Sequence, residues 1–168
     1  SFSAKEELIL KCKYDTILIT LMDASKDIFI EKTSKTPEVD FNFTSGELVL
    51  TGVSIPENAA KFYEPLIAWT AEYIKSPRHT TNFRLNLEYY NSASSLWLAK
   101  MVKLLGTIDQ DGYILFIHVY FSSDDYDDME MDEIKDFIGS LVENIGNTTI
   151  SIGVKAHGTV DNGKVIKE

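Results

Sequence analysis

The pattern of hydrophobic and polar positions becomes regular from about residue 27 and first predicts a hairpin. Residues 28–30 are apolar and predict a short strand. Residues 39–43 alternate apolar and polar side chains, which is typical of a half-buried strand. Ser45 and Gly46 then mark a turn, and residues 48–53 predict the strand that returns beside it.

The next segment changes to the helical period. Its apolar side chains recur at helical spacing, and Ser54 and Glu57 have the spacing of a capping box. Pro56 is predicted to lie in the first turn, where its missing N–H group costs nothing. Pro65 lies inside this helix and is expected to kink it, and Pro77 marks its end.

Three strands and two helices are predicted beyond this helix. Residues 83–89 alternate and predict a strand with one buried face. Residues 113–121 are nearly all apolar and predict a central strand that is covered on both faces. Residues 149–154 predict the last strand. Apolar side chains at helical spacing, over residues 97–108 and 134–145, predict the helices that separate these strands.

This order predicts an α/β fold, because strands that are separated by single helices are joined by crossover connections within one sheet. We expect a mixed sheet of about five to six strands with an N-terminal hairpin and about three helices. Residues 27–155 are predicted to form this domain. Residues 1–26 fit a strand, a helix or a loosely attached arm and are described as an N-terminal extension. The polar residues 156–168 are predicted to be a flexible tail.

The charge of the chain excludes some classes of partner. The formal net charge is -10 and the sequence pI is about 4.7, so we expect no nucleic-acid binding and no anionic membrane partner. Neutral or basic protein surfaces are the expected partners. Cys12 is the only cysteine, which excludes an internal disulfide. The longest apolar run, residues 113–121, is far shorter than the roughly 20 residues of a membrane span, and we expect a cytoplasmic protein.

Motifs for cofactor binding and catalysis are missing from the sequence. It contains no phosphate-binding glycine loop, no HExxH and no GxSxG, and we expect no cofactor. His79, His118 and His157 are scattered, and His118 lies in the most apolar strand, where a buried, hydrogen-bonded histidine is the commoner interpretation. The single cysteine also excludes a cysteine-based zinc site within the chain.

An acidic segment, residues 124–133, allows three interpretations. Carboxylates favour the start of a helix through the backbone dipole. They also suit a protein-binding loop, or a site for Ca²⁺ or Mg²⁺. The EF-hand pattern fails because its central glycine is missing, and we predict no metal site.

The stretch EYYNSASSLWLAK, residues 88–100, joins a predicted strand to a predicted helix through an unusual number of hydroxyl groups. One interpretation is helix capping by Asn91 or Ser92, which needs a single side-chain oxygen. The other is a phosphorylation switch. A helix N-terminus offers unpaired N–H groups and partial positive charge to a phosphate, and the added charge alters which surfaces can dock.

The chain resembles the SiaC family of bacterial regulatory phosphoproteins. The resemblance rests on TPEV at 36–39, SIPENAAKFYEPL at 54–66 and YYNSASS at 89–95, and it runs from about residue 31 to about residue 154. It implies a fold similar to STAS domains and to SpoIIAA-like anti-sigma-factor antagonists. It also implies a non-enzymatic switch that a partner kinase phosphorylates and a PP2C-type phosphatase dephosphorylates. The unphosphorylated form would bind and activate a GGDEF-type diguanylate cyclase, which links the switch to cyclic-di-GMP and biofilm formation.

The resemblance also implies which residues act. Ser92 takes the position of the phosphorylated threonine in the family's N-T-S-S motif, and Ala93 replaces the first serine after it. Asn91, Ser94 and Ser95 are expected to shape the turn and to hydrogen-bond the phosphate.

A partner surface is expected beside this turn. Tyr89 and Tyr90 would contribute to it, although half-buried strand packing explains both tyrosines as well. Lys100 and Lys103 would extend it along the helix, although a solvated helix face explains both lysines.

Two other functions remain open from the sequence. The domain would be a constitutive interaction module if it is never phosphorylated. Alternatively, it would be a divalent-metal-dependent enzyme that uses the acidic segment 124–133 and His118.

Overall fold

The computed structural model describes residues 3–24, 26–122, 131–143, 145–146, 150–159 and 165–167. The elements follow one another as helix, three strands, helix, strand, helix, strand, helix and two strands. Their bounds are α1 Ala4–Ala24, β1 Ile28–Ile30, β2 Glu38–Asn42, β3 Glu47–Ser54, α2 Ala59–Tyr73, β4 Thr80–Tyr90, α3 Ser92–Leu105, β5 Ile114–Ser122, α5 Met131–Val142, β6 Ser151–Thr159 and β7 Val165–Lys167.

The strands form one mixed sheet in the order of the chain, from β1 to β7. β1, β2 and β3 are antiparallel, β3 to β6 are parallel, and β7 returns antiparallel to β6. The predicted α/β class, mixed sheet and N-terminal hairpin are confirmed. The seven strands of the described residues exceed the expected five to six, because β7 had not been predicted.

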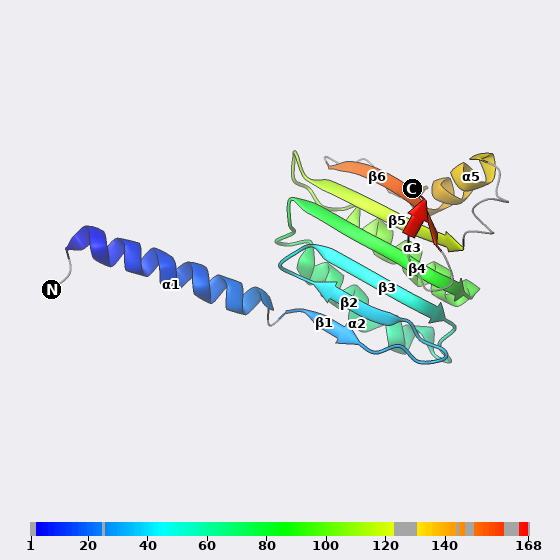
Figure 1. Ribbon diagram of the computed structural model, residues 1–168, viewed down its shortest axis with the longest axis horizontal. Helices are drawn as coiled ribbons and strands as arrows, with labels where there is room; N and C mark the ends of the chain where they lie inside the picture. The colour runs from blue at the N-terminus through cyan, green and yellow to red at the C-terminus, as the bar shows by residue number, and fades with distance from the viewer. Residues whose placement is uncertain are drawn as a thin grey trace.

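The crossover helices α2 and α3 lie on one face of this sheet, behind it in Figure 1, and α5 packs beside α3. This follows from the strand order. Each crossover moves to the next strand in the same direction, and right-handed connections then place every helix on the same side. The core fills the space between helices and sheet. Its largest fully buried side chains include Tyr63, Tyr73, Phe41, Phe43 and Phe83.

The N-terminal extension contains a helix. α1 begins after Ser3, whose hydroxyl accepts a hydrogen bond from the Glu6 amide at 3.3 Å, while the Glu6 carboxylate accepts one from the Ser3 amide at 2.7 Å. The helix extends away from the sheet in Figure 1, and Leu8, Ile9 and Tyr14 are exposed. The predicted boundary at residues 26–27 falls between α1 and β1.

The predicted start of the second helix is wrong. The cap of α2 is Asn58, whose side-chain oxygen accepts a hydrogen bond from the Lys61 amide at 3.0 Å. Ser54 is instead the last residue of β3 and is fully buried, and Glu57 pairs with Lys35. The capping-box spacing of a serine and a glutamate did not predict the start of this helix, because the serine belongs to the preceding strand. Pro65 does lie inside α2, as predicted.

The central strand β5 is not covered by helices on both faces. Leu115, Ile117 and Val119 point into the helix-covered core. His118 and Tyr120 alternate with these residues along the strand and belong to a network of polar side chains on the opposite face. An apolar run therefore predicted the position of the strand correctly but not its surroundings.

The end of the chain also differs from the prediction. β6 continues to Thr159, five residues beyond the predicted end at Val154, and β7 pairs with it. The predicted domain boundary at residues 155–156 therefore falls inside a strand. His157, expected in the tail, is only 3% exposed. Residues 160–164 and 168 of the predicted tail lie outside the described residues.

Candidate functional site

The hydroxyl-rich turn connects the end of β4 to the start of α3. Asn91 has an extended backbone and caps the helix, because its side-chain oxygen accepts a hydrogen bond from the Ser94 amide at 2.9 Å. Its carbonyl accepts the first helical bond, from the Ser95 amide at 3.0 Å. Ser92 is the first helical residue. The cap therefore uses none of the serine hydroxyl groups.

The three serines of the turn have different environments. Ser92 is exposed, whereas Ser94 is fully buried. Ser95 is partly buried, and its hydroxyl donates to the Ser92 carbonyl at 2.7 Å. Among the three, Ser92 presents the most accessible side chain for modification, while the Ser94 hydroxyl is directed into the protein. A phosphate on Ser92 would therefore not contact the Ser94 hydroxyl without rearrangement.

A chain of buried hydroxyl groups fixes this turn from beneath. The Ser94 hydroxyl donates to the Ser54 carbonyl at 2.9 Å, so its single proton is used. The Ser54 hydroxyl donates to the Ser94 oxygen at 2.8 Å. The Tyr63 hydroxyl lies 2.5 Å from the Ser54 oxygen. Because the Ser54 proton is already used, Tyr63 is the donor of this hydrogen bond. All three side chains are fully buried, and burial raises the pKa of Tyr63.

The same residues join three elements. The Ser54 carbonyl at the end of β3 also accepts a hydrogen bond from the Asn91 amide at 3.1 Å. On α2, the Tyr63 ring stacks with Trp97 of α3 at a centroid distance of 6.2 Å. The first turn of α3 is therefore held by a strand, by α2 and by its own cap. This arrangement gives Ser92 a fixed position on the surface.

The residues predicted for the partner surface divide into exposed and half-buried side chains. Tyr89 is 61% exposed, and Lys100 and Lys103 are exposed on α3. Tyr90 packs partly against the core, and burial raises its pKa. The strand alternation breaks at Tyr89 because the register against β3 shifts by one residue beyond Gly52. This shift turns a position that alternation assigns to the core toward solvent.

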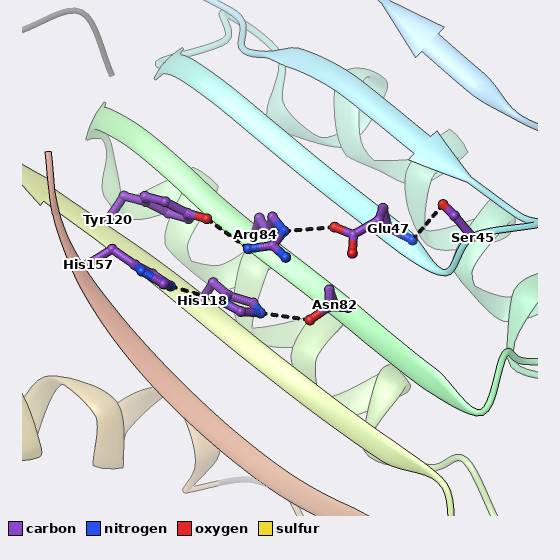
Figure 2. A network of polar contacts seen from close by, with 7 residues as sticks. All are labelled: Ser45, Glu47, Asn82, Arg84, His118, Tyr120 and His157. Atoms are coloured by element: carbon purple, nitrogen blue, oxygen red, sulfur yellow. Dashed lines mark hydrogen bonds and ion pairs between the residues drawn. The ribbon is translucent and has the colours of Figure 1, made fainter. Parts of the chain in front are cut away.

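A second cluster of polar residues lies on the sheet face opposite the helices (Figure 2). Arg84 donates to the Glu47 carboxylate at 2.7 Å and to the Tyr120 hydroxyl at 2.9 Å. Beside this pair, a ring nitrogen of His118, Nε2, lies 2.8 Å from the Asn82 side-chain oxygen. The other, Nδ1, lies 2.9 Å from Nε2 of His157. The predicted buried, hydrogen-bonded state of His118 is confirmed.

The protonation state of His118 follows from this geometry. The pKa of His118 is lowered from 6.5 to about 4, mainly by burial and to a smaller extent by the positive charges of Arg84, His157 and Lys155. Neutral His118 donates through Nε2 to the Asn82 oxygen, so its Nδ1 accepts from His157. A neutral imidazole that uses both nitrogens within the fold is suited to a structural role.

Within the described ranges, no group of three or more His, Cys, Asp or Glu side chains could hold a metal ion. Most of the predicted acidic segment 124–133, namely residues 124–130, lies outside those ranges. Asp132 and Glu133, at its end, lie in the first turn of α5 and are exposed. In the described part of the chain, no helix has the length and apolar character needed to span a bilayer.

The sequence analysis missed three residues of this site. Ser54 had been assigned to a helix cap and Tyr63 had been given no role, yet both anchor the turn between β4 and α3. Leu96 begins the apolar run Leu96-Trp97-Leu98 and was given no role of its own, yet it is 67% exposed. The capping pattern at Asn91 was the available signal that the serines were free for other roles. No local pattern indicates that residues 54 and 94 meet.

Two crystal structures from Pseudomonas aeruginosa have a similar fold. Against apo-SiaC the TM-score is 0.59 at 19% identity, over 77% of this chain and 98% of that one. The second structure is that of the diguanylate cyclase SiaD in complex with its activator SiaC. Against one chain of this complex the TM-score is 0.61 at 20% identity, over 78% of this chain and 100% of that one. These identities support a common fold only.

The sequence comparisons assign the family. An uncharacterised protein of Pseudomonas aeruginosa strain UCBPP-PA14 is 27% identical over 86 residues, which is 51% of this chain and 68% of that protein. The family model for SiaC family regulatory phosphoproteins matches residues 30–145, which include β2 to β5, α2, the turn between β4 and α3, and α3. This match covers most of the chain, and the chain belongs to the SiaC family of regulatory phosphoproteins.

Proposed function

We propose that this protein is a non-enzymatic adaptor whose binding to a partner is switched by phosphorylation of Ser92. The observation that carries the proposal is the contrast within the turn. Ser92 is exposed at the first residue of α3, while Ser94 is fully buried two residues later. The family description as regulatory phosphoproteins supports a phosphorylated residue in the chain.

The location of Ser92 explains why the fold tolerates a phosphate. A phosphoryl group adds roughly -1.5 to -2 charges at neutral pH. At the start of a helix, this charge meets the positive end of the backbone dipole. The anchoring residues Ser54, Tyr63 and Ser94 lie beneath the turn and need not move. The added charge therefore changes the outer surface and leaves the scaffold in place.

The partners that this function needs are proteins. A protein kinase would phosphorylate Ser92, and a PP2C-type phosphatase would reverse the reaction. The regulated protein would be a GGDEF diguanylate cyclase, and this is supported by the similar fold of SiaC, which is described as the activator of the cyclase SiaD. The switch would act in the cytoplasm and control the synthesis of cyclic-di-GMP. Through this messenger it would control biofilm formation.

The test combines mass spectrometry with binding measurements. The chain is purified from its host, and phosphate occupancy is measured at Ser92, Ser94 and Ser95. Binding to each purified GGDEF cyclase of the host is then compared between the unmodified chain and a chain with phosphoserine at position 92. We expect phosphate at Ser92 and at least about a tenfold loss of affinity, since like charges at an interface can cost several kcal/mol.

Two results would count against this function. Binding of a cyclase with equal affinity by both forms would indicate a constitutive interaction module. A Ser92 that never carries phosphate in the host would exclude the switch itself. Ala68→Glu is the control for added charge, because it adds a negative charge at an exposed position of another helix, α2.

A further inference from the structure

The sheet face opposite the helices carries no second layer among the described residues. α2 and α3 lie behind the sheet in Figure 1, and α1 extends away from it. The strands β3 to β6 are parallel, and parallel sheets are usually covered on both faces. This open face is therefore a candidate for an interface.

One row of paired residues crosses the open face at right angles to the strands. Asp40 on β2 pairs with Val49 on β3, and Val49 pairs with Arg84 on β4. Arg84 pairs with His118 on β5, and His118 pairs with Lys155 on β6. Directly paired residues point to the same face of a sheet, so these five side chains share the open face with the network in Figure 2. We call them the open-face row.

The row carries opposite charges at its two ends. Asp40 lies two strands to one side of Arg84 and Lys155 two strands to the other, about 10 Å away in each direction. Both end residues are exposed, and neither forms a salt bridge within the part of the chain that the structure describes. The Glu47 carboxylate neutralises the central Arg84 at 2.7 Å. The row is therefore negative at one end, neutral in the middle and positive at the other end.

Lys155 is held over the open face by an aromatic ring. Its ammonium group lies 4.9 Å from the centroid of the Phe116 ring. That ring lies over Gly153 of β6, where an added Cβ would come within 2.8 Å of it. β7 pairs with β6 only farther along, at Gly158 and Thr159, and leaves the lysine exposed. A side chain that is already ordered loses less entropy on binding.

We propose that the open face packs against the open face of a second copy of the chain, across a two-fold axis that runs along β4. Rotation about this axis exchanges the two ends of the row, so Asp40 of each copy faces the partner's Lys155. Stacked sheets lie about 10 Å apart, a gap that a lysine and an aspartate side chain span together. Arg84 lies at the axis, and its ion pair with Glu47 limits repulsion between the two copies.

The open face has the size and composition of a dimer interface. From β2 to β6 it measures about 24 Å across and about 25 Å along the strands, a flat area of about 600 Å² before side-chain relief is counted. A standard interface buries roughly 800 Å² on each partner. The half-buried side chains of Val49, Phe116 and Tyr120 would form its apolar centre. Phe29, which pairs with Asp40 on β1 and is 61% exposed, would extend it.

A second copy fits this face better than other occupants do. The placement of Asp40 and Lys155 at equal distances from β4 matches the symmetry of a two-fold dimer, and a different protein would not require it. A further layer of helices would need an apolar surface, whereas both ends of the row are charged. Nucleic acid is disfavoured by the net charge of -10.

This dimer would place both sheets inside and the helices outside. α2 and α3 of both copies, and with them both Ser92 side chains, remain at the surface. A partner that binds both copies at once would gain avidity without any new contact. The inference goes beyond the proposed function, and it does not depend on phosphorylation.

Sedimentation velocity of the full chain over a range of concentrations measures the association. We expect an equilibrium between monomer and dimer with a dissociation constant in the micromolar range. Asp40→Lys and Lys155→Asp should each weaken the dimer at least about tenfold, because each places two pairs of like charges in the interface. The combined variant Asp40→Lys/Lys155→Asp exchanges the two charges and should restore the dissociation constant to within about threefold.

The controls make the same changes of charge on the helix side of the protein. Glu64→Lys and Lys61→Asp alter exposed positions of α2 and should leave the dissociation constant within about twofold. Phosphoserine at position 92 should leave it unchanged as well, because α3 lies on the other face of the sheet. Circular dichroism should show that every variant is folded, since the altered side chains are exposed.

Three results would overturn the inference. The first is a chain that stays monomeric at every concentration. The second is a dimer that resists both charge reversals, and loss of that dimer on Leu10→Asp would show that the exposed helix α1 forms the contact instead. The third is a combined variant that stays as weak as the single ones. None of these results bears on Ser92, whose phosphorylation is tested by occupancy and cyclase binding.

Discussion

Ser54 and Ser94 are joined by two hydrogen bonds that run in opposite directions, although 40 residues separate them in the chain. The Ser54 hydroxyl donates to the Ser94 oxygen at 2.8 Å, and the Ser94 hydroxyl donates to the Ser54 carbonyl at 2.9 Å. Both side chains are fully buried. This pair ties the first turn of α3 to the end of β3 and explains why only part of the serine cluster is available at the surface.

Replacing Ser94 by alanine should destabilise the fold by about 1–3 kcal/mol, because the buried Ser54 hydroxyl then has no acceptor at that position. The free energy of unfolding is measured by urea denaturation. Ser95→Ala is the matched control, since it removes a hydroxyl that bonds only locally to the Ser92 carbonyl. A smaller loss for Ser94→Ala than for Ser95→Ala would show that the buried chain contributes no stability.

The cap of α3 gives a second prediction. Asn91→Ala removes the oxygen that accepts the Ser94 amide bond and should cost about 0.5–2 kcal/mol. Asn91→Asp keeps an acceptor and adds a negative charge at the helix N-terminus, so it should preserve stability. The melting temperatures of both variants are measured by thermal denaturation. The comparison shows whether the loss of stability comes from the missing hydrogen-bond acceptor or from any replacement of asparagine. Equal melting temperatures for the alanine and aspartate variants would contradict the capping role.

Gly46 should tolerate a side chain much less well than Gly112. Both have positive φ, 74° and 80°, and alanine at either site pays the left-handed strain of about 1–2 kcal/mol. At Gly46 an added Cβ would also lie 2.6 Å from the Thr80 carbonyl oxygen, whereas nothing lies within 4 Å at Gly112. We expect Gly46→Ala to lose clearly more unfolding free energy than Gly112→Ala in urea. Similar losses would mean that the turn moves to accept the methyl group.

Much of the fold was accessible from local periodicity. The alternation over residues 39–43 and 48–53 predicted the β2–β3 hairpin, because one face of each strand is buried while the other is not. The helical spacing after residue 54 and after Asn91 predicted α2 and α3. These signals are local and need no knowledge of what lies across the sheet.

The failures arise where a distant contact decides a residue's role. Ser54 has capping spacing to Glu57, but it belongs to β3 and its hydroxyl donates to Ser94, while α2 is capped by another residue. His157 looks like a tail residue, yet β6 extends through it and buries it beside His118. At the turn between β4 and α3, the sequence indicated the excess of hydroxyl groups. It did not indicate which hydroxyl faces inward, because this depends on β3 and α2.

His118 gives the protein a specific loss of stability in acid. Its pKa is lowered to about 4 in the fold, mainly by burial, from an ordinary value of 6.5. The unfolded chain therefore takes up a proton as the pH falls below 6.5 while the folded protein does not. The stabilising contribution is complete above pH 6.5 and is lost progressively between 6.5 and 4. Between pH 7.5 and 5.5 this single group should remove roughly 1.3 kcal/mol of unfolding free energy.

The variant His118→Gln isolates this effect. Glutamine cannot titrate, and its amide can still donate to the Asn82 oxygen, so the variant should lose roughly 1.3 kcal/mol of the pH dependence between pH 7.5 and 5.5. Urea denaturation at several pH values in this interval measures it, and the interval stays above the sequence pI of about 4.7. His79→Gln is the control, because it removes an exposed imidazole. If His118→Gln keeps the full pH dependence of the unaltered protein while remaining folded, His118 binds its proton at the same pH in the folded and the unfolded chain. Burial within the network on the open sheet face would then not lower its pKa.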